Sequence, residues 1–323
     1  MTKKKTKFHT RLGAACDSGV PGHLLIIAIS HQMPDPIADM TSYVINLDVN
    51  SNPLTYETLI KGDKEMFPKY YSGFNCMVRD PSQTLFVGED DGIVRYKHGK
   101  TDIIDFGIHA GITNCCYARG VNDVVFGTAK GEIIHFKNYQ LESTPIASPL
   151  KIKSGESNVS AIHGIGPDFM VAVGQSGLVS RYQNGKWERI KPPSNIRLTT
   201  VWCRSEKEIY IGGWSGHSWR WDGEDRWQKL KVDFKFEMRD FDFSDIAEYQ
   251  GILYAACYTN GVYCLDGNTW APIPKVREED VSKLAITHAG LIGLGALWGD
   301  SGSWLTRFDG KTWTTQQIQV DPV

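Results

Sequence analysis

The sequence has no long apolar run, no excess of one charge and no clustered cysteines. The longest apolar stretch near the start, residues 24–29, is too short to span a bilayer. No apolar core or small-residue cleavage site follows the basic N-terminal residues, so we expect no export signal. The formal net charge of −2 gives no general attraction to nucleic acid or anionic lipid. We therefore expect a cytoplasmic chain that binds neither nucleic acid nor membrane.

The motifs of common enzymes and metal sites are also missing. The seven cysteines show no CxxC spacing, which indicates free thiols, and adjacent Cys115 and Cys116 should point to opposite faces of one strand. There is no GxSxG or HExxH, and the nine histidines are dispersed. Two glycine-rich segments, residues 212–216 and 293–295, lead into strands rather than helices, which argues against a phosphate loop. We assign no catalytic residue, no metal and no cofactor.

What is present is a repeated pattern of short apolar runs and turns. Residues 159–190 contain four such runs, rich in Val, Ile and Tyr and separated by Gly, Asn or Asp, which is typical of a four-stranded antiparallel unit. The glycine that opens the third strand recurs every 39 to 46 residues. These glycines are Gly92, Gly131, Gly177, Gly216, Gly261 and Gly302.

A period of this length with four short strands predicts an all-β fold, a seven-bladed β-propeller of four-stranded antiparallel blades. We expect one domain over residues 1–323, with a flexible tail at 1–7, an irregular first blade at 8–62 and six regular blades at 72–320. The first blade's strands are expected at 8–15, 23–30, 42–48 and 55–60. The ring should close by packing of the first blade on the last.

A second signal follows the third strand in four repeats. It reads NGKW at 184–187, DGEDRW at 222–227, DGNTW at 266–270 and DGKTW at 309–313. Asn-Gly and Asp-Gly favour type I′ hairpin turns. The tryptophan after each turn should begin the outer strand and pack on the next blade. Trp219 and Trp221, two residues apart on a strand, should share one face and pack between blades.

These repeats resemble those of bacterial seven-bladed propellers, especially the two-component-regulator sensor type. The resemblance covers about residues 72–320 and is carried by Gly177 to Tyr182, Asn184 to Trp187 and Phe308 to Trp313. It implies the fold alone, since no kinase or DNA-binding region accompanies the repeats and propellers serve many functions. The Asp-box of sialidases does not fit, because its Asp and Gly are separated by one residue. The WD-repeat pattern fits poorly, because most third strands lack a closing Trp-Asp.

Strand order indicates where a binding site would lie. If strands a to d run from channel to rim, the b–c and d–a connections share one face, which the sequence makes acidic with interspersed aromatics. Its candidate partner-binding residues are Glu89, Asp90, Asp91, Trp214, Glu237, Asp240, Tyr258, Asn260, Glu278, Glu279, Trp298 and Asp300. Aromatic anchors supply most interface energy, and carboxylates select basic partners.

The first hypothesis is therefore non-catalytic binding of another protein with a basic surface, a toxin or a complex subunit. Its specific form is a bacterial immunity protein that neutralises a cognate toxin. The second is a hydrolase or lyase with its site at the central channel, because propeller sites assemble from distant blades. The third is a carbohydrate-binding, lectin-like propeller that stacks sugars on Trp214 and Trp298.

Overall fold

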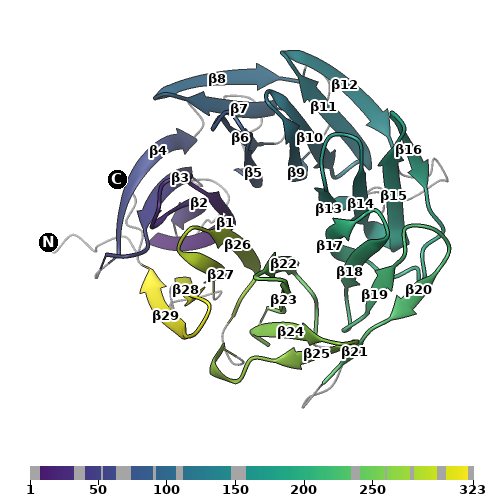
Figure 1. Cartoon of the computed structure of the whole chain (residues 1–323). Coiled ribbons are helices and arrows are strands. Elements are labelled where there is room, and N and C mark those ends of the chain that lie inside the picture. Colours follow the sequence, from purple (N-terminus) through teal and green to yellow (C-terminus); the bar gives the residue numbers. More distant parts are fainter. Residues whose placement is uncertain are drawn as a thin grey trace, which may run out of the picture.

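Each repeat folds into one antiparallel sheet, and seven sheets surround a central axis (Figure 1). The computed structural model describes residues 8–32, 41–51, 54–62, 74–89, 92–106, 112–146, 158–233, 241–258, 260–276, 280–296 and 303–318. Strands a to d of a blade are consecutive in sequence, and strand a lies next to the axis. The predicted seven-bladed β-propeller is confirmed.

The blades have the following bounds. Blade 1 contains β1 (Phe8–Asp17), β2 (His23–Gln32), β3 (Thr41–Asp48) and β4 (Thr55–Gly62). Blade 2 contains β5 (Cys76–Arg79), β6 (Leu85–Gly88), β7 (Gly92–Lys97) and β8 (Lys100–Asp105). Blade 3 contains β9 (Thr113–Gly120), β10 (Asp123–Thr128), β11 (Glu132–Lys137) and β12 (Gln140–Pro145). Blade 4 contains β13 (Val159–Gly164), β14 (Met170–Gly174), the short 3-10 segment η1 (Gln175–Gly177), β15 (Leu178–Gln183) and β16 (Lys186–Arg189).

The remaining blades continue the pattern with one addition. Blade 5 contains β17 (Leu198–Ser205), β18 (Glu208–Gly213), β19 (Ser218–Trp221) and β20 (Trp227–Lys229). Blade 6 contains β22 (Asp245–Tyr249), β23 (Ile252–Ala256), β24 (Val262–Asp266) and β25 (Thr269–Pro272), followed by η3 (Pro274–Val276). Blade 7 contains β26 (Lys283–Thr287), β27 (Gly290–Ala296), β28 (Ser303–Phe308) and β29 (Trp313–Ile318). The chain leaving blade 5 forms β21 (Lys231–Val232), which pairs in parallel with β25 and gives blade 6 a fifth strand.

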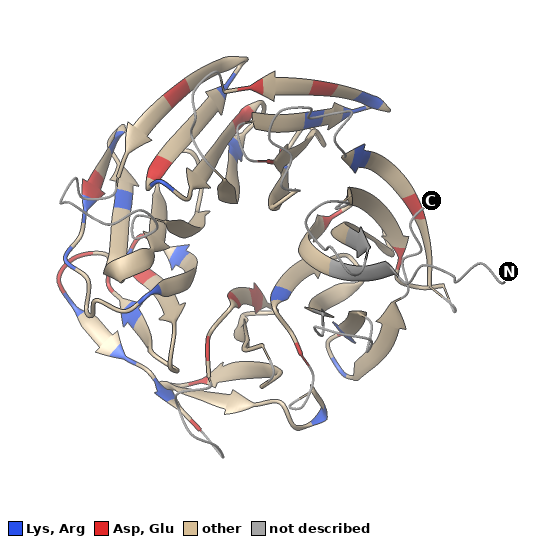
Figure 2. Cartoon of the chain, turned by 180° about the vertical axis from the view of Figure 1, so that it is seen from behind, with Lys and Arg blue, Asp and Glu red and all other residues tan. Residues whose placement is uncertain are grey.

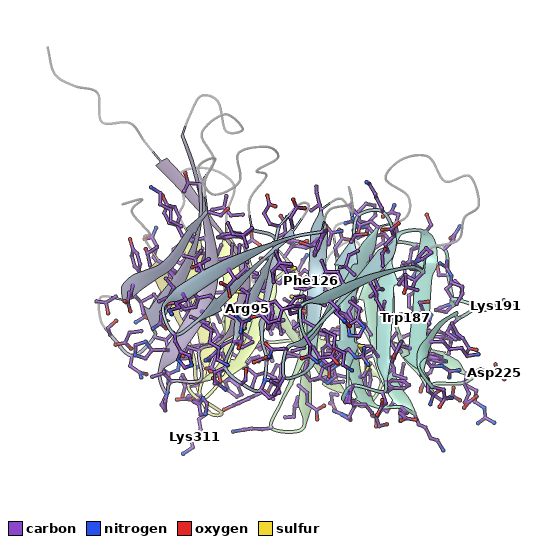
Figure 3. All side chains as sticks on the ribbon, turned by 90° about the horizontal axis from the view of Figure 1, so that it is seen from above. Arg95, Phe126, Trp187, Lys191, Asp225 and Lys311 are labelled. Carbon is purple, nitrogen blue, oxygen red and sulfur yellow. The ribbon has the colours of Figure 1, made fainter. Side chains whose placement is uncertain are left out.

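The ring has two different faces. The b–c connections within blades and the d–a connections between blades lie on one, which we call the loop face. The a–b and c–d turns lie on the other, the turn face. In the edge-on view of Figure 3, Lys311 of the β28–β29 turn stands at the lower edge, and Phe126 of β10 lies inside the slab.

Seven buried apolar clusters hold the ring together, one between each pair of neighbouring blades. The second strands are buried on both faces: Val124 and Phe126 of β10 pack toward blade 2, while Val125 packs toward blade 4. This two-sided burial explains why these strands read as continuous apolar runs. Cys115 and Cys116 join different clusters, so their predicted opposite orientation is confirmed.

Blade 1 closes the ring by packing on blade 7, as expected. Leu24, Ile26 and Ile45 of blade 1 share a cluster with Ile292 and Leu294 of blade 7, all fully buried. No strand is exchanged between these blades in the described part of the chain, because each sheet is built from consecutive strands. Closure therefore depends on side-chain packing between two complete sheets.

The recurring tryptophans are structural. Each lies directly opposite a large residue at or next to the end of the third strand, as Trp187 does with Tyr182 and Trp227 with Trp221. The expectation that they pack on the next blade is wrong: each joins the cluster that its blade shares with the preceding blade. The rings of Trp221 and Trp227 stack with centroids 5.0 Å apart. Cross-strand aromatic pairs of this kind stabilise a sheet and cover its rim. Trp219 and Trp221 pack with residues of blade 4, which confirms the expected inter-blade role.

The expected turn type is correct for Asn-Gly and wrong for Asp-Gly. Asn184 and Gly185 have φ values of 55° and 80°, as a type I′ turn requires. Asp222 and Asp309 do not have positive φ; they accept hydrogen bonds instead. The Oδ1 of Asp309 accepts from the amides of Lys311 and Thr312, both at 2.8 Å. The carboxylate closes the turn, and within the Asp-Gly pair the positive φ falls on Gly310 alone, at 96°.

Within the described ranges, no helical segment has the length and apolar character that a bilayer crossing requires.

A buried carboxylate, Asp80 in the β5–β6 turn, links two blades on the turn face. Asp80 is 2% exposed. Oδ1 accepts from the amide and hydroxyl of Ser82 (2.8 and 2.7 Å) and from the amide of Thr84 (3.0 Å). Oδ2 accepts from the amide of Asn122 in blade 3 at 2.8 Å. The carboxylate therefore satisfies amides of its own turn and of the next blade.

We predict that Asp80→Ala lowers the free energy of unfolding by about 2–4 kcal/mol, because it leaves buried donors without an acceptor. Asp102→Ala is the matched control. Asp102 forms an ion pair with Arg95 at 2.8 Å, but its side chain is 52% exposed, so its loss should cost less than about 1 kcal/mol. Urea denaturation of both variants measures the difference, and equal costs would contradict the assigned role of Asp80.

Candidate functional site

The first strands of all seven blades line two adjoining cavities along the axis. The cavity at the loop face has a volume of about 540 Å³, and the deeper one about 230 Å³. Residues such as Asn75, Asn114, Thr199 and Lys283 line both. A space of this size fits a small ligand or a few side chains of a partner. We refer to the larger cavity as the channel mouth.

Three asparagines line the channel mouth on blades 2 to 4. Asn114 donates through Nδ2 to the Oδ1 of Asn158 at 3.1 Å and to the carbonyl of Val159 at 3.3 Å, which joins blades 3 and 4. The Nδ2 of Asn75 is shielded from solvent and has no hydrogen-bond acceptor among the described residues. This side of the mouth is polar but uncharged.

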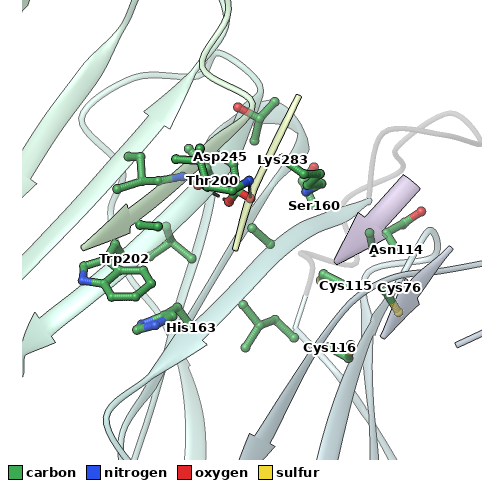
Figure 4. A pocket seen from close by; sticks show the side chains of 18 of the residues that line it. Cys76, Asn114, Cys115, Cys116, Ser160, His163, Thr200, Trp202, Asp245 and Lys283 are labelled. Atoms are coloured by element: carbon green, nitrogen blue, oxygen red, sulfur yellow. Dashed lines mark hydrogen bonds between the residues drawn. The ribbon is translucent and has the colours of Figure 1, made fainter. Parts of the chain in front are cut away.

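Charged and phenolic side chains line the mouth on blades 5 to 7. They are Arg197 before β17, Tyr258 after β23, Asp280 before β26 and Lys283 at the start of β26. Burial raises the pKa of Asp280. The nearby carboxylate of Asp245 raises the pKa of Lys283, so the ammonium stays protonated. Figure 4 shows Asp245 and Lys283 together at the cavity wall.

Trp214 stands on the loop face beside Arg197. It is the first residue of a tight β18–β19 turn, in which Ser215 and Gly216 have φ values of 54° and 66°. The Trp214 amide donates to the carbonyl of Arg197 at 3.1 Å, and the Ser215 amide donates to Oδ1 of Asp242 at 2.8 Å. The ring is 43% exposed, and the Arg197 guanidinium lies 5.1 Å from its centroid. The turn therefore presents a large aromatic side chain on a fixed backbone.

Tyr258 and Asn260 occupy the corresponding turn of blade 6. Tyr258 is 45% exposed and has a φ of 44°, which is unusual for a bulky residue. Its carbonyl accepts from the amide of Val281 at 3.0 Å, which ties the turn to the beginning of blade 7. The amide of Asn260 donates to the carbonyl of Cys257 at 3.0 Å. Two of the predicted aromatic anchors are thus exposed on well-held turns of adjacent blades.

Glu89 differs from its expected role on an open acidic surface. The residue is only 3% exposed, and its carbonyl accepts from the hydroxyl of Thr113 in blade 3 at 2.8 Å. A carboxylate buried between two blades cannot select a partner by direct contact. Its place in the sequence, beside Asp90 and Asp91, gave no sign of burial.

The other predicted residues lie outside the described residues. They are Asp90, Asp91, Glu237, Asp240, Glu278, Glu279, Trp298 and Asp300. The part of the mouth that the structure does describe carries both signs of charge, with Arg197 and Lys283 against Asp280, and Asp245 lies in the deeper cavity. Figure 2 likewise shows Lys and Arg interspersed with Asp and Glu around the whole ring.

Sequence reasoning missed Arg197, Lys283 and the three asparagines. Each lies within the first residues of an a strand or just ahead of it, where a polar residue precedes or begins an apolar run. That position recurs with the blade period, so the signal was present.

The deeper cavity contains a stacked pair, His163 of β13 and Trp202 of β17. Their rings lie 4.0 Å apart, and Nδ1 of His163 accepts from the amide of Cys203 at 3.0 Å. Burial lowers the pKa of His163 to about 4. Figure 4 shows the pair across the cavity from Cys76, Cys115 and Cys116.

Two thiols of this cavity, Cys115 and Cys116, are poor nucleophiles. All seven cysteines are free. Burial raises the pKa of both Cys115 and Cys116 well above the usual value, so neither is a thiolate near neutral pH. No group of three or more His, Cys, Asp or Glu side chains in the described ranges is placed to hold a metal ion.

We predict that His163 makes the protein less stable as the pH falls from about 6.5 to 4. The pKa of this imidazole is lower in the folded chain than in the unfolded chain, so the unfolded chain binds more protons in this interval. The contribution is on the order of 3 kcal/mol. His163→Gln keeps an acceptor for the Cys203 amide and cannot titrate. Urea denaturation at several pH values should show a shallower loss for the variant, and parallel curves would contradict the assignment.

Comparisons with known proteins show the fold and one partial relative. No family model matches the chain. U3-55K superposes with a TM-score of 0.65 at 12% identity over 89% of this chain and 91% of that one. YCF48 from Cyanidioschyzon merolae superposes with a TM-score of 0.64 at 15% identity over 94% and 96%. The WD40 propeller of Doa1 gives 0.65 at 10% identity over 90% and 92%. At these identities the likeness concerns the fold alone.

The similarity to two-component-regulator propellers stays a prediction.

A curated relative, the immune protein Tsi7 of Pseudomonas aeruginosa, is 28% identical over 154 residues. The match covers 48% of this chain and 47% of the relative, about half of each. This chain is thus a seven-bladed propeller that is similar, over part of its length, to an immune protein.

Proposed function

We propose that this chain is an immunity protein that binds a toxic protein through its loop face and neutralises it. The observation that carries the proposal is the exposure of Trp214 and Tyr258 on adjacent blades, 43% and 45%, at the edge of a polar cavity. Exposed aromatic side chains on rigid supports are typical anchors of protein interfaces. The partial similarity to Tsi7, named as an immune protein, supports the same function.

The two anchors need little reorganisation to bind. Asp242 and Val281, which precede the first strand of the next blade in each case, hold the two turns: the Asp242 carboxylate accepts from the Ser215 amide, and the Val281 amide donates to the Tyr258 carbonyl. A partner therefore meets side chains whose backbone is already fixed, which lowers the entropic cost of association. A basic toxin surface would suit the carboxylates that the sequence places in the connections before blades 6 and 7. We propose that binding takes place in the cytoplasm.

We predict that Trp214→Ala and Tyr258→Ala each weaken the complex with the cognate toxin about tenfold or more, because each removes a large buried anchor from the interface. The control is Ile103→Ala on the outer strand of blade 2, a residue that is 49% exposed and remote from the mouth. The candidate toxin is the product of the neighbouring gene, and binding is measured by calorimetry with the purified chains.

Growth provides the functional readout. Cells that produce the candidate toxin should survive with the native chain or Ile103→Ala and should lose protection with the double variant Trp214→Ala/Tyr258→Ala. If the native chain neither protects cells nor captures a stoichiometric protein from its own organism, the proposal is wrong.

A further inference from the structure

Arg197 differs from the other arginines of the inner strands. Arg79, Arg119 and Arg204 use their guanidinium groups to hold neighbouring blades. Arg79 donates to the carbonyl of Asp17 at 3.3 Å, and Arg119 donates to the carbonyl of Pro167 at 2.7 Å. In the described part of the chain, the Arg197 side chain makes no hydrogen bond and no ion pair, although it lines the channel mouth. A partly shielded guanidinium without a hydrogen-bond acceptor lowers the stability of the fold unless a ligand supplies the acceptor.

Trp214 restricts the position of this guanidinium. The ring centroid lies 5.1 Å from the guanidinium carbon, and the backbones of the two residues are joined by a 3.1 Å hydrogen bond. Cation–π contact leaves the edge of the guanidinium plane free, which is the edge that binds a carboxylate through two parallel hydrogen bonds. The pair is therefore partly organised for a planar anion.

Lys283 provides a second cation in the same cavity. Its neighbour Asp245 is already engaged, because its Oδ1 accepts from its own strand at the Ile246 amide (3.1 Å) and its Oδ2 accepts from the Leu284 amide (3.0 Å). Asp245 keeps Lys283 charged, and the ammonium has no ion pair within 4.0 Å in the described residues. Arg197 thus lacks an anionic partner in the described residues, and the carboxylate beside Lys283 is shared with two backbone amides.

The charges of the mouth favour a singly charged anion. Asp280 lines the same cavity, and Asp245 lies deeper, so the two cations face two carboxylates. A phosphate dianion would be repelled by both carboxylates. A carboxylate needs only the guanidinium edge and one ammonium, and its remaining atoms can place a hydrogen-bond donor against Asp280.

We propose that the channel mouth binds a carboxylate between Arg197 and Lys283. The carboxylate comes either from an acidic side chain of a protein partner or from a free small acid. A partner's side chain as the source rests on the proposed function. In that case the basic surface of the toxin contacts the rim around the mouth, and one acidic side chain of the toxin enters the mouth. A free small acid as the source is independent of the proposed function.

Calorimetry at low salt tests the site without any partner. The probes are the peptide acetyl-Gly-Glu-Gly-amide, its Gln analogue and butyrate. We expect the Glu peptide or butyrate to bind and the Gln peptide not to bind. Arg197→Gln should weaken binding about tenfold or more. Asp280→Asn should strengthen it about two- to fivefold, because it removes a like charge. Arg220→Gln, on the exposed outer part of blade 5, should leave it unchanged.

The outcomes separate the two sources and the two proposals. Binding of the Glu peptide but not butyrate assigns the site to a partner's side chain, and the reverse assigns it to a free acid. If neither binds, or if Arg197→Gln binds as the native chain does, the carboxylate site is wrong. The fold of the variant is checked by its urea midpoint. If the native chain and Arg197→Gln both capture a toxin, the carboxylate site plays no part in that complex. That result would not contradict the immunity proposal.

Discussion

Packing of complete sheets against one another is the constraint on which the rest of this protein depends. Every blade buries apolar side chains on both faces, and the clusters form an unbroken circuit from blade 1 to blade 7 and back. Burial of apolar area supplies most of the favourable free energy, at roughly 25 cal/mol per Å². Because no strand is shared between the first and last blades, the closing cluster around Ile26 and Leu294 has to hold by packing alone.

Polar contacts at the turn face complement this packing. Asp80 binds the turn of blade 3, Arg119 the turn of blade 4 and Arg204 the turn of blade 6. These contacts join neighbouring blades by hydrogen bonds in addition to the apolar packing. The turn face thus uses several charged groups for structure, whereas Asn75 and Arg197 at the channel mouth keep shielded nitrogen atoms without an acceptor in the described residues.

That division gives the candidate site its character. The fold brings Arg197, which precedes blade 5, to the same cavity as Asp280 and Lys283 at the start of blade 7, and Trp214 and Tyr258 stand beside them on turns held by the next blade. A cavity of about 540 Å³ with such groups is suited to recognition. The buried thiols below it, with raised pKa values, are suited to packing.

The sequence by itself determined the fold, the blade boundaries and the structural role of the tryptophans. Period-2 alternation, turn residues and apolar second strands are local signals, and they recur in the repeats. The Asn184-Gly185 turn before Trp187 is one example of the turn signal. It also singled out Trp214 and Tyr258, because an aromatic residue in a b–c turn has no place in the blade core. Only the tertiary structure decided that Glu89 is buried, that Asp309 closes its turn through its side chain, and that Arg197 and Lys283 meet at one cavity. Those properties depend on distances between blades, which a linear pattern does not contain.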